Sequence, residues 1–454
     1  MPVSEIKKRS RKNFPDVEKY NRQWDHTQHE IMTNTVKYPN RTVVSEYIDE
    51  DGKKQKKKKI VELNRIGLPY QKMITKTAAT FFCGIPVKYI NQSDSEEAYR
   101  EFQDLIDDAK IRFIDKDVYV ATSRYTECAE MWYFRTEKEE DEEGNESVID
   151  RKIRVKVLTP DLYTFYPEFD NTGKMIRFSR EWKVESQDKE IFESYTAKRV
   201  ERYERSKGGE WEEVSNQVNA IGKIPFVFYQ QENVEWHDVQ DMIERLEEIY
   251  SNIGESNDRF AFPILKLKGT VVGSMAQDRA GRVLQLEGDN ADAEFVEQPN
   301  ATESLLMEIN RLERDVYDLT STPNLSPEAL KGLGNLLSGV AMRYFFMAAH
   351  LKVMDKQSIY EPAFMRRISI VAEMMNKMSG TRGLDVKPVI TPFEIDSREA
   401  LAEYLMSVNG GQPLMSQRMS MEEFGITDAD EVIKEIEDDT NRRADYGNAF
   451  EFMT

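Results

Sequence analysis

Apolar residues recur every three or four positions in two segments of the chain, residues 239–253 and 305–319. This spacing predicts two amphipathic helices, each with a narrow apolar seam and a largely charged or polar circumference. The seam residues that we select as candidate contacts between copies of the chain are Val239, Leu246, Ile253, Leu305, Ile309, Leu312, Val316 and Leu319. Two such helices bury little surface by themselves, so we expect the pair to pack against the same pair in other copies.

The segment between the two helices, residues 263–299, alternates short apolar runs with glycines. Glycine punctuation of this kind predicts short strands separated by turns, here at residues 263–267, 270–272, 282–286 and 293–296. The segment is too small to enclose a core of its own. We therefore expect it to be stabilised by strand pairing or by packing between subunits.

The N-terminal half of the chain mixes helical and alternating patterns. Residues 1–35 are polar and weakly helical, which is typical of an arm that lies on a neighbouring chain. Periodic apolar stripes predict helices, and alternation predicts a β-rich region from residue 148 to residue 228. The predicted helices span residues 64–82, 96–109 and 115–127, and an acidic loop is predicted at 137–146. This mixture predicts an α+β fold.

A hairpin predicted at residues 42–61 contains a run of lysines at residues 53–59. Turn chemistry at Glu50, Asp51 and Gly52 separates its two strands. We interpret this segment as a mobile, solvated hairpin, with a contact to nucleic acid or to capsid protein as the alternative.

A loop rich in proline and glycine follows the second seam helix, at residues 320–339. It leads into a long helix, predicted at residues 336–378, which Pro362 is expected to kink. Short helices are predicted in the tail, at residues 399–407, 416–424 and 427–438.

Composition and charge narrow the classes of function. The chain has 454 residues, with 63 Lys plus Arg against 82 Asp plus Glu, which gives a formal charge of -19. Gripping nucleic acid by phosphate neutralisation needs clustered cations, so the charge disfavours that mode and suits a surface along which a polyanion slides. Cys83 and Cys128 are expected to be reduced core thiols. No apolar run is long enough to span a membrane, so we expect a cytosol-like compartment or a particle assembled there.

Motifs for enzymatic chemistry are missing from the sequence. Four histidines are present, and His26 and His29, which share one helical face, are expected to be solvated rather than to bind zinc. Neither a phosphate-binding Gly-x-x-x-x-Gly-Lys-Ser/Thr loop nor a Gly-x-Ser-x-Gly nucleophile motif occurs. We therefore expect a protein that is not an enzyme and that holds no metal and no cofactor.

Four blocks of sequence, taken in order, resemble the tailed-bacteriophage portal proteins of the SPP1-like family. The first, NRIGLPYQKMITKTAATFFCGIPVKY at residues 64–89, is similar to the family's early helix followed by Gly-x-Pro-Val. The second, IGKIPFVF at residues 221–228, is similar to the entry to its stem. The third, NLSPEALKGLGNLLSGVAM at residues 324–342, is similar to its loop and the start of the next helix, and residues 413–437 resemble its C-terminal block.

The resemblance implies an α+β portal fold in a ring oligomer, typically a dodecamer. The implied regions are a wing at residues 1–236, a first stem helix at 237–262, a small β-rich clip at 263–299, a second stem helix at 300–320, a tunnel loop at 321–338, a long wing helix at 339–390 and a helical crown at 391–454. The lysine-rich hairpin and the short crown depart from the family's pattern.

The same resemblance implies a function at one vertex of a phage capsid, where the ring conducts double-stranded DNA during packaging and ejection. Ser321, Asn324, Lys331 and Asn335 of the tunnel loop would face the DNA channel or simply be solvated. The implied partners are the terminase large subunit, the head-tail connector or adaptor, and the major capsid and scaffolding proteins, with no membrane. The implied location is the virion, after assembly in the host cytoplasm.

Two alternatives stay open at this point. The first is another ring-forming head-tail connector or tail structural protein, which would share the helical seams. The second is a nucleic-acid enzyme with a carboxylate metal site, which would use some of the abundant acidic residues.

Overall fold

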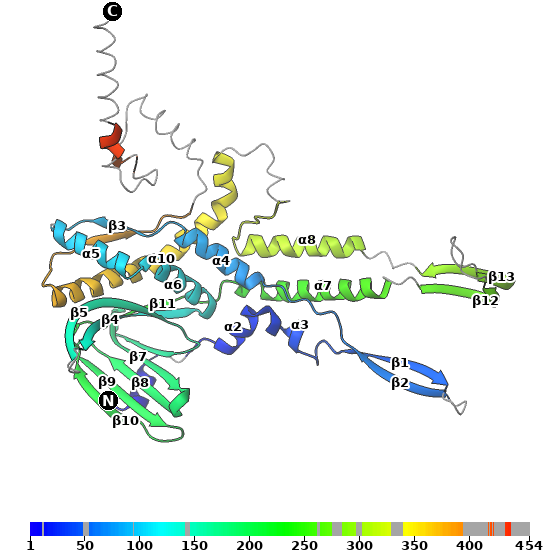
Figure 1. Ribbon diagram of the computed structural model, residues 1–454, viewed down its shortest axis with the longest axis horizontal. Coiled ribbons are helices and arrows are strands. Elements are labelled where there is room, and N and C mark those ends of the chain that lie inside the picture. Colours follow the sequence, from blue (N-terminus) through cyan, green and yellow to red (C-terminus); the bar gives the residue numbers. More distant parts are fainter. Residues whose placement is uncertain are drawn as a thin grey trace, which may run out of the picture. The chain divides into compact units, whose positions relative to one another are not determined.

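In the computed structural model, the chain consists of two compact units. The first comprises Met1–Asn324 and Ala348–Phe393, and the second comprises Leu325–Met347 and Glu394–Thr454. The structure describes residues 1–10, 13–48, 54–93, 95–140, 146–260, 264–274, 284–296, 302–327, 339–393, 416, 418–419, 421 and 432–436. Figure 1 shows the helices and strands of the described residues. Most of the second unit lies outside these ranges, and so do most of the predicted tail helices, apart from a helical turn at 432–436.

A five-stranded antiparallel sheet with the order β10-β9-β8-β7-β6 confirms the predicted β-rich region. Its strands are β6 (Thr164–Phe169), β7 (Met175–Val184), β8 (Lys189–Tyr195), β9 (Arg199–Ser206) and β10 (Glu212–Val218). Successive side chains of a strand point to opposite faces. Phe165 accordingly packs in one apolar core, and the adjacent Tyr166 packs in another.

Helix α1 (Val3–Arg9) lies on the Tyr166 face of this sheet. Val3 and Ile6 are buried there against Tyr166 and Phe192. Further along, the Trp24 ring of α2 (Val17–Trp24) lies 5.8 Å from the Trp236 ring. The expectation that this segment lies on a neighbouring chain is therefore wrong, because Val3, Ile6 and Ile31 are buried on the chain's own body.

The second sheet has three strands in the order β11-β4-β5. They are β4 (Glu127–Glu140), β5 (Glu146–Leu158) and β11 (Phe226–Gln230). Phe226 of β11 stacks on Phe178 of β7, with 4.4 Å between ring centroids, so the two sheets share a core. The loop predicted at residues 137–146 is shorter than expected, because strand pairing continues to Glu140 and Glu146.

Helices cover this body, and α10 (Gly339–Met378) is the longest of those described. The others are α4 (Tyr70–Cys83), α5 (Glu96–Asp108) and α6 (Ile111–Tyr125), and a two-stranded sheet joins β3 (Lys88–Asn91) to β14 (Val386–Val389). Phe82 of α4 and Tyr360 of α10 pack with 4.7 Å between ring centroids. Helix α10 continues through Pro362, and the kink that we expect there stays a prediction.

A buried ionic cluster fixes α10 to the body. Arg367, which is fully buried, pairs with Asp115 of α6 at 2.6 Å and with Glu130 of β4. The Tyr229 hydroxyl donates to Glu130 at 2.6 Å. Burial raises the pKa of Asp115 to about 6, and the nearby Glu130 charge adds to this while Arg367 opposes it. A second buried carboxylate, Glu235, is paired with two lysines of α10 and is described with the site below.

Helix α4 begins at Tyr70, six residues later than predicted. The residue before a proline is disfavoured in the α conformation, and Pro69 immediately precedes the helix. Residues 62–69 instead form an irregular segment, which we call the strap. The apolar stripe of residues 70–83 was sufficient to predict the helix but not its start.

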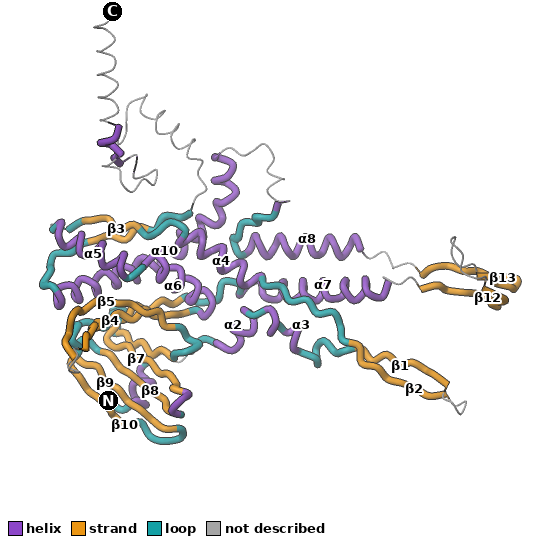
Figure 2. The backbone as a smooth tube through the Cα atoms, in the orientation of Figure 1, coloured by secondary structure: helices purple, strands orange, loops and turns teal. Residues whose placement is uncertain are grey.

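Two hairpins complete the first unit, and both are two-stranded antiparallel ribbons (Figure 2). They are β1 (Arg41–Ile48) with β2 (Lys54–Val61), and β12 (Ile264–Ser274) with β13 (Leu284–Val296). The four short strands predicted in residues 263–299 are therefore two long strands. The irregularities fall inside the strands, as register shifts at Lys268/Thr270 and Val271/Gly273, and Gly269 has a φ of +113°.

Candidate functional site

Helices α7 (Gln240–Phe260) and α8 (Thr302–Leu319) pack against each other and form the helical pair on which the site is built (Figure 1). They confirm the two predicted helices, with α7 preceded by the short 3-10 helix His237–Val239. Val239, Leu246, Ile309 and Val316 are at most 5% exposed, and they share a core with Ile74 of α4. Ile253, Leu305 and Leu312 are half-buried against this core, and Leu319 is exposed.

The role that we assigned to the seam therefore changes. Side chains such as Val239 and Val316, which are fully buried inside one chain, cannot also contact another copy. They join α7 to α8 of the same chain because α4 and the residues around Trp236 close over them. The apolar spacing identifies the right side chains, but it does not show that other residues of the same chain bury them.

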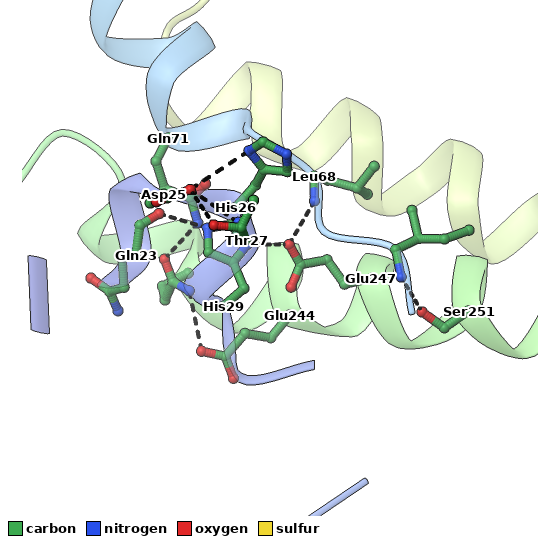
Figure 3. Close-up of polar contacts among 12 residues, drawn as sticks. Gln23, Asp25, His26, Thr27, His29, Leu68, Gln71, Glu244, Glu247 and Ser251 are labelled. Carbon is green, nitrogen blue, oxygen red and sulfur yellow. Dashed lines mark hydrogen bonds and ion pairs between the residues drawn. The ribbon is translucent and has the colours of Figure 1, made fainter. Parts of the chain in front are cut away.

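The buried face of α7 is wider than the predicted seam because two polar side chains are buried as well. Glu247 is 1% exposed and Ser251 is 6% exposed. The Leu68 N–H donates to Glu247 Oε1 at 2.8 Å, and the Ile66 N–H donates to Ser251 Oγ at 3.0 Å (Figure 3). These contacts satisfy strap N–H groups that no helix or sheet satisfies, and they fix the strap along α7.

His29 is the second partner of Glu247. Its Nδ1 lies 2.5 Å from Glu247 Oε1, and its Nε2 lies 2.8 Å from the Gln23 carbonyl oxygen (Figure 3). Burial by itself would lower the pKa of His29, but the hydrogen bond and charge of Glu247 outweigh it and raise the pKa above its usual value. The expectation of a solvated His29 is wrong, because a buried carboxylate pairs with the ring.

Gly67 lies at the point where the strap crosses the backbone of His26. A Cβ atom at this position would collide with the His26 carbonyl oxygen. Glycine is therefore required by close approach of two backbones. Hydrogen bonds join both the strap and the histidine segment to α7.

Polar contacts also join α7 to α8, and α8 to α4. Arg245 of α7 donates to Glu308 of α8 at 3.0 Å. Glu313 accepts from the hydroxyls of Tyr70 and Tyr250, each at 3.0 Å. Burial and the Glu313 charge raise the pKa of Tyr70. Glu308 and Glu313, two acidic residues of α8, are therefore engaged in contacts within the chain.

The side of α8 that faces away from the core is exposed and carries both apolar and charged residues. Met307 is 73% exposed and Leu306 is 51% exposed. Glu303, Arg314 and Asp318, which lie on the same side at helical spacing from Met307, are exposed as well. Large exposed apolar side chains beside charges are typical of a surface that contacts another protein.

Ser321 lies in the turn that follows the last residue of α8, Leu319. It has a φ of +52°, the Thr322 N–H donates to the Tyr317 carbonyl at 2.9 Å, and the Ser321 N–H donates to the Asp318 carbonyl at 3.1 Å. This is the Schellman arrangement of a helix C-terminus, with serine in the position that usually holds glycine. Ser321 and Asn324 are half-buried. Lys331 and Asn335, the other tunnel-loop residues that we selected, lie outside the described residues.

The loop after α8 is fixed to α10. The Lys352 ammonium donates to the Thr320 carbonyl at 2.9 Å and pairs with Glu235 at 2.6 Å. Lys356 pairs with the same carboxylate at 2.5 Å. Although burial alone would raise the pKa of Glu235, the two lysines lower it to about 2.

The described residues also bear on metal binding and on membrane insertion. Among those residues, no group of three or more His, Cys, Asp or Glu side chains is placed to hold a metal ion. Within the same ranges, no helix is both long and apolar enough to cross a membrane. Cys83 and Cys128 are free thiols, as expected, and burial raises the pKa of each above its usual value.

These features define an α+β fold organised around a helical pair whose exposed face carries both apolar and charged residues. The family model described as "Phage portal protein, SPP1 Gp6-like" matches residues 3–446. The chain therefore belongs to this family of phage portal proteins, and the resemblance seen in its sequence blocks is confirmed. Proteins of this family are structural components of the phage.

Solved structures and curated proteins were compared as well. A chain in the structure titled "Virion of native gene transfer agent (GTA) particle" is 13% identical, with a TM-score of 0.38, over 79% of this chain and 88% of that one. A chain in "Neck of native GTA particle computed with C12 symmetry" gives the same identity and coverage with a TM-score of 0.39. At these scores neither structure adds to the assignment, which comes from the family model. The search of curated proteins found no match.

Proposed function

We propose that copies of this chain form a ring at one vertex of a phage capsid, and that double-stranded DNA passes through the ring during packaging and ejection. The observation that carries this proposal is the match of residues 3–446 to the portal family. Twelve copies is the number that the family resemblance suggests. The virion is the corresponding location, after assembly in the host cytoplasm.

We assign α7 and α8 to the stem of the ring, at residues 237–262 and 300–320. The β12–β13 ribbon corresponds to the clip at 263–299, residues 1–236 and 339–390 to the wing, 321–338 to the tunnel loop and 391–454 to the crown. A helix of 21 residues such as α7 is about 30 Å long, which suits the wall of a channel.

The charge of the helical pair suits the passage of DNA. Helices α7 and α8 together carry eleven acidic and four basic residues. A wall of this sign repels phosphates, so the duplex meets few binding sites as it moves. Lys331, in the proposed tunnel loop, would supply a transient phosphate contact.

We assign the contacts between copies to the exposed side of α8 rather than to its buried seam. Leu306 and Met307 offer apolar surface there, each more than half exposed. Burying them against the next copy would stabilise the ring by the hydrophobic effect, and the surrounding charges would form the polar rim of the interface. The terminase large subunit, the connector, and the capsid and scaffolding proteins would dock elsewhere on the assembled ring.

Negative-stain micrographs of the purified protein test the proposal directly. The wild type is expected to give annular particles in axial view, and Met307→Asp is expected to give fewer rings while its circular dichroism spectrum stays unchanged. Val218→Asp is the matched control, because Val218 is 78% exposed on edge strand β10, away from the helical pair. A wild type that stays monomeric at every concentration would overturn the proposed function.

A further inference from the structure

Two lysines of α10 share one buried carboxylate. Lys352 and Lys356 are four residues apart, so they lie on the same side of the helix. Their ammonium groups pair with the two oxygens of Glu235, Lys352 with Oε2 at 2.6 Å and Lys356 with Oε1 at 2.5 Å, and the Glu235 side chain is 2% exposed. One lysine would be sufficient to neutralise this carboxylate, so the cluster carries a surplus of positive charge.

Each lysine makes one further hydrogen bond, and the two bonds reach different parts of the chain. Lys356 donates to the side-chain oxygen of Gln231, which follows β11, at 2.8 Å. Lys352 donates to the carbonyl oxygen of Thr320, which follows the last residue of α8, at 2.9 Å. Lys352 therefore joins the carboxylate cluster to the end of α8.

The end of α8 attracts the positive charge that Glu235 does not neutralise. The carbonyl groups of the last helical turn have no partner inside the helix, and the helix dipole places about half a negative charge there. A lysine side chain that donates to these carbonyls is therefore favourable. The geometry explains the second lysine of the cluster as a residue placed for the end of α8 rather than for the carboxylate alone.

The residues that follow α8 lie against the body of the chain. Thr320 and Thr322 are 7% and 6% exposed. Thr322 lines a small cavity together with Phe81 of α4 and Val353 of α10. Residues 320–323, which we call the loop root, are thus held both by packing and by a charged hydrogen bond from α10.

We propose that Lys352 is a positioning residue for the passage of DNA, because it fixes the loop root to α10 and so gives the rest of the tunnel loop a constant starting place in the ring. Polar groups of a loop act on a moving duplex at a defined point only when the loop itself does not move with it. The inference rests on the proposed function, since the tunnel loop is part of that proposal.

Hydrogen exchange of backbone amides tests whether Lys352 fixes the loop root. The amides of residues 320–322 report on it, because each donates to a carbonyl at the end of α8. Lys352→Met removes the bond to Thr320, and we expect these amides to exchange about tenfold faster, as for the loss of a hydrogen bond to a charged group.

Lys356→Met is the matched control. Both variants leave Glu235 with one lysine, and each loses one further hydrogen bond, but Lys356 does not contact the loop root. We therefore expect exchange at residues 320–322 to stay at the wild-type rate in Lys356→Met. Equal exchange in the two variants would overturn the proposal.

Retained DNA is the second measurement, and it reports on function. Rings of both variants are counted in micrographs, and nuclease-protected DNA per capsid is determined. We expect both variants to assemble like the wild type and Lys352→Met alone to lose retained DNA, whereas a general loss of stability would affect the two variants equally. Wild-type retention in Lys352→Met, in spite of faster exchange, would overturn the positioning role.

The remaining outcomes separate this inference from the proposed function. Normal rings, with the two variants equal in exchange and in retained DNA, would refute the inference and leave the proposed function intact. A wild type that forms no rings would refute both. If Lys352→Met does not fold, Lys352→Gln and Lys356→Gln replace the pair. Failure of both Lys352 variants to fold, with the Lys356 variants folded, would show that the lysine stabilises the body and would also refute the inference.

Discussion

At the scale of single residues, the strap comes very close to the backbone of the segment that contains His26. Gly67 faces the carbonyl oxygen of His26, and a methyl group at position 67 has no free space. We predict that Gly67→Ala destabilises the protein by about 1–3 kcal/mol, because either the strap or the histidine segment must shift. The midpoint of urea-induced unfolding, compared at equal oligomeric state, measures the effect.

Gly254 supplies the matched control for this prediction. It lies inside α7, and a Cβ atom there would make an ordinary contact of 3.5 Å with the Asn64 side chain. Gly254→Ala is therefore expected to be neutral or to stabilise by about 0.5–1 kcal/mol, because alanine favours the helix. Equal losses at the two positions would contradict the steric explanation of Gly67.

The pair formed by His29 and Glu247 predicts a dependence of stability on pH. The pKa of His29 is raised in the folded chain, so its protonation stabilises the fold. This contribution is fully present below about pH 6.5, the usual pKa of histidine, and is lost as the pH rises through the folded value. We expect His29→Gln, which cannot titrate, to remove this dependence.

Unfolding free energies of wild type and His29→Gln at two pH values measure the prediction. The wild type should exceed the variant by about 1.5–3 kcal/mol at pH values near 5.5, as for a hydrogen bond between charged groups, and by less near pH 9. A difference that stays constant, or that grows with pH, would show that the imidazole is neutral in the folded chain.

The sequence predicted the apolar side chains of this region better than the polar ones. Spacing alone places Val239, Leu246 and Val316 on the apolar face of their helices, and each is buried. It could not identify Glu247 or Ser251 as buried, because hydropathy places such residues in solvent. Their partners are N–H groups of the strap, and these are brought to α7 only by the tertiary fold.

At the scale of elements, α10 is joined to the body by buried charge as well as by apolar packing. Arg367 pairs with two carboxylates and makes a hydrogen bond to the hydroxyl of Tyr89 at 3.1 Å. We predict that Arg367→Met destabilises the first unit by about 3–5 kcal/mol, because Glu130 and Asp115 would stay buried without a cation. Thermal unfolding followed by circular dichroism measures the loss.

Lys377 on the same helix provides the control for Arg367. It pairs with Glu373 at 3.8 Å on an exposed face. Lys377→Met should change stability by no more than about 0.5 kcal/mol, as is usual for surface ion pairs. If Arg367→Met were as mild as Lys377→Met, the cluster would contribute little to the docking of α10.

Elements differ in how far the sequence predicts them. Long helices with a clear apolar stripe, such as α7, α8 and α10, were expected at nearly their observed bounds. The start of α4 was misplaced because apolar spacing continues into the strap, where Pro69 and the contacts to α7 decide the conformation. The β12–β13 ribbon was divided into four strands because glycines that lie in or beside register shifts look like turns in a sequence.

At the scale of the whole molecule, the helical pair has two different faces, an apolar seam and an exposed outer face. Its apolar seam closes the core of a single chain, so a folded subunit does not depend on its neighbours for that core. Its outer face, with Met307 exposed among charges, is the surface that we propose for contacts with other copies. A subunit built in this way can fold first and assemble afterwards. The variant Leu312→Asp perturbs the seam, so it would test folding rather than assembly.

The loop that follows α8 is the element through which the proposed ring would act on DNA. Its first residues are held by the Schellman turn at Ser321 and by Lys352, while residues 328–338 lie outside the described residues. We predict that deleting residues 327–335 leaves ring assembly intact and lowers the amount of DNA retained in particles. Assembly survives because the deletion spares the outer face of α8 and its helix end, whereas the channel loses polar groups of the proposed tunnel loop.

The measurement is nuclease-protected DNA per capsid, with rings counted in parallel micrographs. The matched control replaces residues 327–335 with a Gly/Ser segment of equal length, which keeps the chain connection and removes the side chains. Loss of DNA in both variants would assign the effect to the side chains, and loss in the deletion alone would assign it to loop length. If both variants package and retain DNA normally, the loop has no part in the passage of DNA, while the ring proposed from the family match would stand.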